Sequence, residues 1–154
     1  MKFNTKAVHK GQKPEKLYGS VSLPIYQTST FKQNEIGEYI YDYSRAGNPT
    51  RSSLEENVCS LENGKDAVAF SSGLSAITSI IQLFSSGDHM IFTDNVYGGT
   101  FRLLDTIMKK YNIEQSWVDT SSIDQIVSAI KDNTKLIFIE SPTNPMMILS
   151  DIKA

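Results

Sequence analysis

The chain has 154 residues, of which 40% are hydrophobic, and this is enough to bury one core. Its 15 basic and 17 acidic residues are well mixed, which argues against a nucleic-acid-binding or anionic-membrane surface. The single cysteine, Cys59, excludes an internal disulfide, and His9 and His89 lack nearby metal-ligand partners, so no metal is expected. No apolar run approaches the length of a membrane span and no signal peptide opens the chain, so we predict a cytoplasmic protein.

The first 47 residues differ in pattern from the rest of the chain. Glycines and prolines interrupt every helical or strand period there, at Gly11, Pro14, Gly19, Pro24 and Gly37. A segment of this kind forms no core of its own. We therefore expect residues 1–47 to be extended and to lie over another surface, in this subunit or in a neighbouring one.

Helices and strands alternate from Asn48 onward. Asn48 and Pro49 are typical of a helix start, and Gly64 is expected to end this helix after Leu61. The later elements are predicted to be strands at 67–70, 90–93, 113–118 and 136–139, with helices at 74–84 and 122–130 and a helix whose buried stripe is Phe101, Leu104, Ile107 and Met108. The alternation predicts an α/β fold with a mostly parallel sheet and helices on both faces.

Three of the predicted strands end in loops that are rich in polar residues and glycine. Open α/β sheets bind ligands beyond the carboxyl ends of their strands, so these loops are candidates for a site. The first, Ser71-Ser72-Gly73, opens a helix and suits a phosphate, although taken alone it is better explained by ordinary capping without a ligand. Neither a Walker loop nor a GxGxxG sequence is present, which favours a phosphate compound smaller than a nucleotide.

The other candidates each have a functional and a structural interpretation. Tyr97, followed by two glycines, is placed either to cover a flat ligand or to fill a turn. Glu140 faces the same rim or is a solvated carboxylate, and Asn144, between Pro142 and Pro145, offers its amide to a ligand or to its own loop. Arg45, in Tyr43-Ser44-Arg45, suits a phosphate, but an arginine in such a triplet is usually a surface residue. Arg51 and Arg102 are expected on exposed helix faces.

Taken together, these segments resemble the cysteine/methionine-metabolism family of fold-type I (aspartate-aminotransferase-like) enzymes, which depend on pyridoxal 5'-phosphate. The resemblance covers nearly the whole chain and is carried by 21–31, 43–50, 71–77, 97–100 and 140–145. Within the family the chain is most similar to cystathionine γ-lyases and γ-synthases. Methionine γ-lyases usually have the sequence Tyr-Gly-Cys at this point, with cysteine where this chain has Gly99. Cystathionine β-lyases usually depart from Tyr-Gly-Gly-Thr.

The resemblance implies roles for particular residues. Gly73 and Leu74 would donate backbone N–H groups to the cofactor phosphate, although the family usually has methionine at position 74. Tyr97 would stack on the pyridine ring and assist proton transfer, Asn144 would bond the phenolic oxygen of the ring, and Glu140 would support that side of the site. Two further residues would reach the phosphate of a neighbouring subunit in a homodimer or homotetramer, namely Tyr43 and Arg45.

The implied activity is γ-elimination or γ-replacement on cystathionine or activated homoserine, in methionine and cysteine metabolism. An acylhomoserine sulfhydrylase or a methionine γ-lyase is the alternative within the family. Family chains are more than twice as long, and their cofactor-binding lysine, pyridine-binding aspartate and substrate-binding arginine would lie beyond Ala154. We therefore expect 48–154 to be the first part of the cofactor-binding domain, and this piece alone to be inactive. A Rossmann-type nucleotide enzyme and a non-enzymatic interaction module are the alternatives outside the family.

Overall fold

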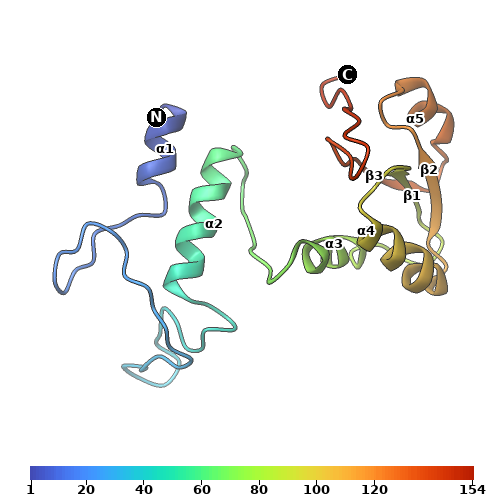
Figure 1. Cartoon of the computed structure of the whole chain (residues 1–154). Coiled ribbons are helices and arrows are strands. Elements are labelled where there is room, and N and C mark those ends of the chain that lie inside the picture. Colours follow the sequence, from blue (N-terminus) through green and yellow to red (C-terminus); the bar gives the residue numbers. More distant parts are fainter. The chain divides into compact units, whose positions relative to one another are not determined.

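A computed structural model describes all 154 residues and divides them into two compact units, Met1–Ala69 and Phe70–Ala154 (Figure 1). The division falls later than residue 47, because the helix that follows Asn48 packs against the N-terminal residues. None of the helices combines the length and the apolar character that crossing a membrane requires.

The first unit contains two helices, α1 (Phe3–His9) and α2 (Pro49–Leu61). The predicted start of α2 is confirmed, since the Asn48 side chain accepts a hydrogen bond from the N–H of Thr50. Helix α1 was not expected from the sequence. The C-terminal end of α1 is stabilised by α2. The side-chain amide of Asn57 in α2 donates hydrogen bonds to the carbonyl oxygens of Lys6, Ala7 and Lys10.

The second unit is built on a parallel sheet of three strands, β1 (His89–Thr93), β2 (Glu114–Val118) and β3 (Thr134–Phe138), in the order β2-β1-β3. All five residues of β1 are buried, as expected for a central strand covered on both faces. These three strands and their parallel arrangement confirm the predicted α/β class.

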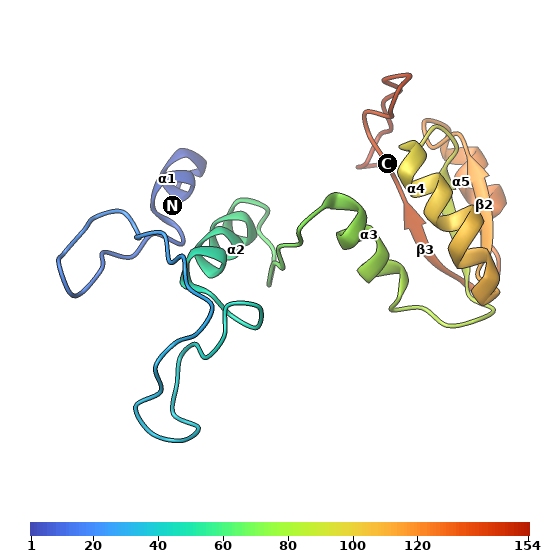
Figure 2. The same cartoon turned by 60° about the horizontal axis from the view of Figure 1, so that its bottom comes forward.

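Helical segments connect the strands and cover the sheet. Helix α3 (Gly73–Ile81) precedes β1, α4 (Gly98–Arg102) continues into a π-helical segment and a 3₁₀ turn before β2, and α5 (Ile123–Ala129) joins β2 to β3. The two crossovers run in opposite directions across the sheet. Because such crossovers are right-handed, α4 and α5 lie on opposite faces, as Figure 2 shows.

The core of this unit is apolar and centres on β1. Met90 and Phe92 are fully buried on one face, and the Phe92 ring lies 5.1 Å from that of Trp117 and 5.8 Å from that of Phe138. The cluster is completed by side chains from α3, from the helical turns after α4 and from the residue just before β2, namely Ile81, Leu103, Leu104, Met108 and Ile113.

Two predicted elements are wrong in detail. Residues 67–70 form no strand, and Val68 is 69% exposed, because a strand is stable only with a neighbour to pair with and these residues have none. The predicted helix around Leu104 is a short α-helix followed by a π-helical segment (Leu103–Ile107) and a 3₁₀ turn (Met108–Tyr111). Two side chains of its expected buried stripe, Phe101 and Ile107, are accordingly half exposed.

Candidate functional site

The candidate site lies where β1 and β3 end at the same edge of the sheet. In the order β2-β1-β3, the first crossover leaves β1 toward β2 and the second returns past β1 to β3. The strand order therefore reverses between β1 and β3, and ligands of open α/β sheets bind at such points. Tyr97 lies in the loop that follows β1, and Glu140 and Asn144 lie in the loop that follows β3.

The Glu140 carboxylate joins these two loops. It accepts hydrogen bonds from the backbone N–H of Tyr97, at 3.0 Å to Oε2 and 3.2 Å to Oε1. Its Oε1 also accepts from the backbone N–H of Asn144 at 3.1 Å. Bonds to an ionised acceptor are stronger than neutral ones, so Glu140 fixes both backbones relative to each other. Three residues that the sequence placed at one rim are thus directly bonded.

A second bond between the same loops was not foreseen. Oδ1 of Asn95 accepts a hydrogen bond from the backbone N–H of Met146 at 3.2 Å. The loop after β3 is also closed on itself, since Thr143 donates its N–H to the Ile148 carbonyl at 3.0 Å and its hydroxyl accepts from the Ile148 N–H at 2.9 Å. Asparagine and threonine commonly bond nearby backbone groups in loops, and this was the available signal.

The side chains of Tyr97 and Asn144 remain available to a ligand. The Tyr97 ring is 49% exposed and lies against Gly99, where an added Cβ would come within 2.3 Å of a ring carbon. A side chain at position 99 would therefore displace the ring. Asn144 is exposed, and its side-chain amide forms no hydrogen bond within the chain.

Gly73 and Leu74 lie at the exposed start of α3. The Ser72 hydroxyl caps this helix by accepting from the N–H of Ser75 at 3.1 Å, as ordinary capping requires. An added Cβ at Gly73 would meet no atom within 4 Å, so packing within the chain does not explain this glycine. Neither Gly73 nor Leu74 forms a hydrogen bond with Tyr97, Glu140 or Asn144, and their role in binding phosphate stays a prediction.

Tyr43 and Arg45 lie in the first unit, on a turn just before α2. The N–H groups of Ala46 and Gly47 both donate to the Tyr43 carbonyl at 2.9 Å, which closes the turn. The Arg45 guanidinium carbon lies 4.9 Å from the centre of the Tyr43 ring, within range of a cation–π contact. The two side chains therefore form one local group.

The sequence interpretation of Arg51 was wrong, since this residue holds the same turn. Its guanidinium donates to the carbonyl oxygen of Ser44 at 3.0 Å and to that of Ala46 at 2.9 Å, on either side of Arg45. It also forms an ion pair with Glu55 at 3.4 Å. A cation in the first turn of a helix opposes the helix dipole, and this unfavourable position was a usable sign of a specific partner.

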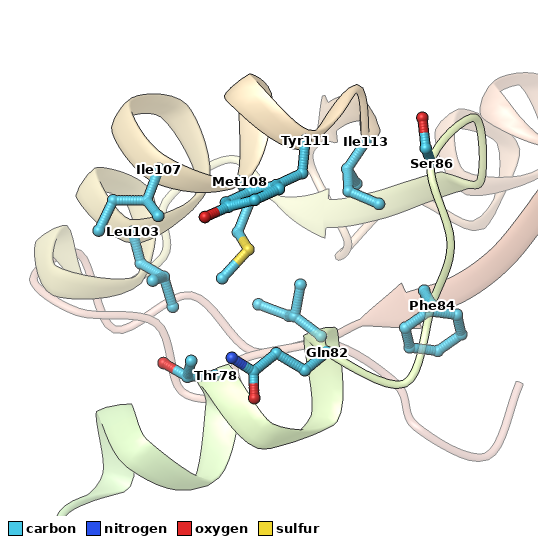
Figure 3. A pocket seen from close by; sticks show the side chains of 10 residues that line it. Thr78, Gln82, Phe84, Ser86, Leu103, Ile107, Met108, Tyr111 and Ile113 are labelled. Atoms are coloured by element: carbon cyan, nitrogen blue, oxygen red, sulfur yellow. The ribbon is translucent and has the colours of Figure 1, made fainter.

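A cavity of about 640 Å³ opens elsewhere in the second unit, between α3 and the segment that follows α4 (Figure 3). Leu103 and Met108 point into it from one side, and Thr78 and Gln82 from the other. Its lining is mainly apolar and includes none of the predicted site residues. The chemistry of the rim is therefore separate from this cavity.

The fold and the bonded loops define a parallel α/β protein with a candidate ligand site at the edge where its strand order reverses. The sequence matches the family described as Cys/Met metabolism PLP-dependent enzyme over residues 4–154. The chain belongs to this family, whose members depend on pyridoxal phosphate.

Known proteins similar to the chain include both cystathionine beta-lyases and cystathionine gamma-lyases. It is 51% identical over 152 residues to a cystathionine beta-lyase of Lactococcus lactis subsp. cremoris (strain MG1363), covering 98% of this chain and 40% of that protein. It is 48% identical over 153 residues to a cystathionine gamma-lyase of Bacillus subtilis (strain 168), covering 99% of this chain and 40% of that protein. The expectation that β-lyases are less similar is therefore wrong.

A solved structure confirms the fold. The crystal structure of cystathionine gamma-lyase from Lactobacillus plantarum complexed with L-serine matches with a TM-score of 0.90 and 44% identity, over 97% of this chain and 39% of that one. The chain thus spans about two fifths of the length of the relatives it matches.

Proposed function

We propose that this chain supplies part of the cofactor site of an enzyme of sulfur amino-acid metabolism that performs γ-elimination or γ-replacement. Its substrates are cystathionine or an activated homoserine. The observation that carries the proposal is the bonding of Tyr97 and Asn144 to one carboxylate, Glu140, in a chain of a pyridoxal-phosphate-dependent family. Because the relatives are longer, the remaining groups of the site are proposed to come from outside these 154 residues.

The residues at the rim fit a flat, phosphorylated aromatic cofactor. The Tyr97 ring is half exposed and the Asn144 amide is unbonded, so both have surface to offer. The space above Gly73 is open to a phosphate at the start of a nine-residue helix. The Oγ1 atom of Thr100, in α4, is buried without a hydrogen-bond partner, three residues after Tyr97.

Each residue then has a defined task. When bound, pyridoxal phosphate withdraws electrons from the substrate carbon next to the amino group. Tyr97 would hold the ring by stacking, and its hydroxyl would take up or release a proton near the substrate. Asn144 would donate its amide to the ring oxygen. Glu140 keeps the backbones of Tyr97 and Asn144 in place.

We also propose that Tyr43 and Arg45 bind the cofactor phosphate of a neighbouring subunit in a homodimer or homotetramer. Arginine binds phosphate through paired N–H groups, and the Tyr43 hydroxyl adds a donor. The first unit supports an assembly because it leaves large apolar side chains exposed, among them Tyr18 (88%), Val21 (81%) and Ile40 (91%). The cytoplasmic location expected from the composition stays a prediction.

A second candidate reaction is β-elimination from cystathionine. It is favoured by the 51% identity to a protein named cystathionine beta-lyase. The two reactions differ in which bond of cystathionine breaks, so the products separate them. Cleavage on the γ side yields cysteine, and cleavage on the β side yields homocysteine.

The proposal is tested with the full-length protein that carries this chain. We expect a visible absorption band on addition of pyridoxal phosphate, and turnover of cystathionine. Tyr97→Phe keeps the ring but loses the hydroxyl, so we expect turnover to fall about 100-fold while the band persists. Arg102→Lys, at an exposed position, is the control. Protein that stays colourless with added cofactor contradicts the proposal, and the 154-residue chain alone is expected to be inactive.

A further inference from the structure

A buried hydroxyl ends the central strand of the sheet. Thr93, the last residue of β1, is 1% exposed. Valine has nearly the same shape and is favoured in strands, whereas a buried hydroxyl is costly unless it is hydrogen-bonded. The bonds made by the Thr93 hydroxyl therefore explain why a polar residue stands there.

These bonds bring the ends of three strands together. Oγ1 of Thr93 accepts a hydrogen bond from the backbone N–H of Glu140, beyond the end of β3, at 3.1 Å. It lies 3.0 Å from Oγ1 of Thr120, which follows β2, and 3.5 Å from the carbonyl oxygen of Phe138. The position of the Glu140 backbone is thus tied to both neighbouring strands.

The same set of hydroxyls continues past Thr120 and returns to the residue beside Glu140. Thr120 is 2% exposed, and its Oγ1 lies 2.8 Å from Oγ of Ser150. The backbone N–H of Ser150 in turn donates to Oγ of Ser141 at 3.0 Å. We name Thr93, Thr120, Ser150 and Ser141 the hydroxyl chain.

We propose that the hydroxyl chain is a positioning device for the candidate site, with Thr93 and Thr120 as its principal positioning residues. It fixes the backbone at Glu140, and the Glu140 carboxylate in turn fixes the backbones of Tyr97 and Asn144. The catalytic consequence of this device rests on the proposed function. The effect of the hydroxyl chain on the position of Glu140 is independent of the proposed function.

Matched threonine variants separate positioning from general stability. Thr93→Val removes the hydroxyl without changing the volume, and Thr93→Ser restores the hydroxyl. Thr134→Val is the control, because the Thr134 hydroxyl lies at the other end of β3, where it contacts Nδ1 of His89 at 2.7 Å and accepts from the Lys131 N–H at 2.8 Å. Both valine variants lose a hydroxyl from this sheet, but only one loses it at the rim.

The first measurement is the hydrogen exchange of individual backbone amides in the full-length protein. In Thr93→Val we expect the Tyr97 and Asn144 amides to exchange about five- to tenfold faster than in the wild type, because their acceptor is no longer fixed. Thr93→Ser is expected to restore the slow exchange, and Thr134→Val to leave these two amides unchanged. Equal exchange at Tyr97 and Asn144 in Thr93→Val and Thr134→Val would overturn the proposal.

The second measurement is kinetic. With substrate turnover present, Thr93→Val is expected to lower kcat about tenfold with little change in KM, and Thr134→Val to lower Tm without lowering kcat. Unchanged kcat in Thr93→Val, despite faster amide exchange, overturns the catalytic part of the inference. A wild-type protein that binds no pyridoxal phosphate refutes the proposed function instead, while the amide exchange still decides the positioning role.

Discussion

Nδ1 of His89 lies 2.7 Å from Oγ1 of Thr134, at the edge of the sheet opposite the candidate site. Nε2 of the same ring lies 2.9 Å from Oγ of Ser116, so one buried histidine links all three strands. Burial lowers the pKa of His89, and the positive charge of Lys131 lowers it further, while Glu114 acts in the opposite direction. The neutral ring is therefore the form that the fold stabilises.

The lowered pKa of His89 predicts a loss of stability in mild acid. Below the ordinary histidine pKa of about 6.5, the unfolded chain binds a proton that the folded chain resists. This contribution to stability is complete above pH 6.5 and is lost as the pH falls toward the folded-state pKa. Urea unfolding between pH 5 and 8 measures it. His89→Gln should lose less stability than the wild type over this range, and equal losses would contradict the prediction.

Replacing Arg51 should loosen the turn that carries Tyr43 and Arg45. Lysine carries a single ammonium group, which cannot reproduce the paired bonds of the guanidinium to the Ser44 and Ala46 carbonyls. In Arg51→Lys we expect faster amide exchange at Ala46 and, in the holoenzyme, about tenfold weaker cofactor binding. The exposed Arg102→Lys is the matched control and should change neither quantity. If Arg51→Lys bound the cofactor as tightly as the wild type, the hydrogen bonds of Arg51 would not be needed to hold this turn.

Removing the Glu140 carboxylate should separate the two loops of the candidate site. Glu140→Ala leaves the N–H groups of Tyr97 and Asn144 without their acceptor, whereas Glu140→Gln keeps one neutral acceptor oxygen. We expect cofactor affinity to fall about 10- to 100-fold in the alanine variant and less in the glutamine variant. Titration with pyridoxal phosphate, followed by absorbance, gives both values. The reverse order of the two variants would count against a role as acceptor.

The aromatic cluster at β1 should dominate the stability of the second unit. Phe92 is fully buried between Trp117 and Phe138, so Phe92→Ala is expected to lower the free energy of unfolding by about 3–5 kcal/mol. Phe101 contacts the same Trp117 ring at 5.2 Å but is 46% exposed, and Phe101→Ala should cost clearly less. Fluorescence of Trp117, the only tryptophan of these 154 residues, follows unfolding in both variants. If both variants lost a similar free energy of unfolding, the aromatic cluster around Phe92 would not be the main stabilising core.

The sequence predicted elements well where local chemistry and periodicity determine them. Asn48 caps α2 through its own side chain, and the buried apolar runs of β1 and β3 identify strands without further information. Helix α1 was missed because its end is held by Asn57, which lies about 50 residues away in the sequence. No periodicity encodes such a contact.

The same distinction holds at the π-helical segment after α4. The Gln115 side chain donates to the carbonyl oxygen of Leu104 at 2.9 Å, which satisfies a group in this irregular turn. A residue of the next strand therefore stabilises the departure from a regular helix, and the spacing of apolar residues could not show it.

The candidate site was predictable as a location but not as a set of bonds. Strand ends that are rich in polar residues placed Tyr97, Glu140 and Asn144 at one rim, because parallel strands end together. That Glu140 accepts from backbone N–H groups depends on how the two loops fold back. The sequence shows side chains, and it gives no direct sign of which backbone groups they satisfy.

Adding a methyl group at Gly99 should reorient the Tyr97 ring rather than unfold the protein. An added Cβ would overlap the outer ring atoms, and these belong to a half-exposed side chain that is able to rotate away. We expect Gly99→Ala to change turnover, with a shift in Tm within about 2 °C. Gly98→Ala is the control, since its nearest contact is the Arg102 side chain at 3.8 Å. A large drop in Tm for Gly99→Ala alone would contradict this.

Position 99 thus offers a route for divergence within a family that shares one scaffold. An added Cβ there meets only the Tyr97 ring among its nearest atoms, whereas the Tyr97 N–H that bonds Glu140 belongs to the backbone, so we expect the ring to move and this hydrogen bond to stay. Family members that differ at this residue are expected to hold the Tyr97 ring at a different angle over the same sheet, so this one position would tune the site without altering the fold.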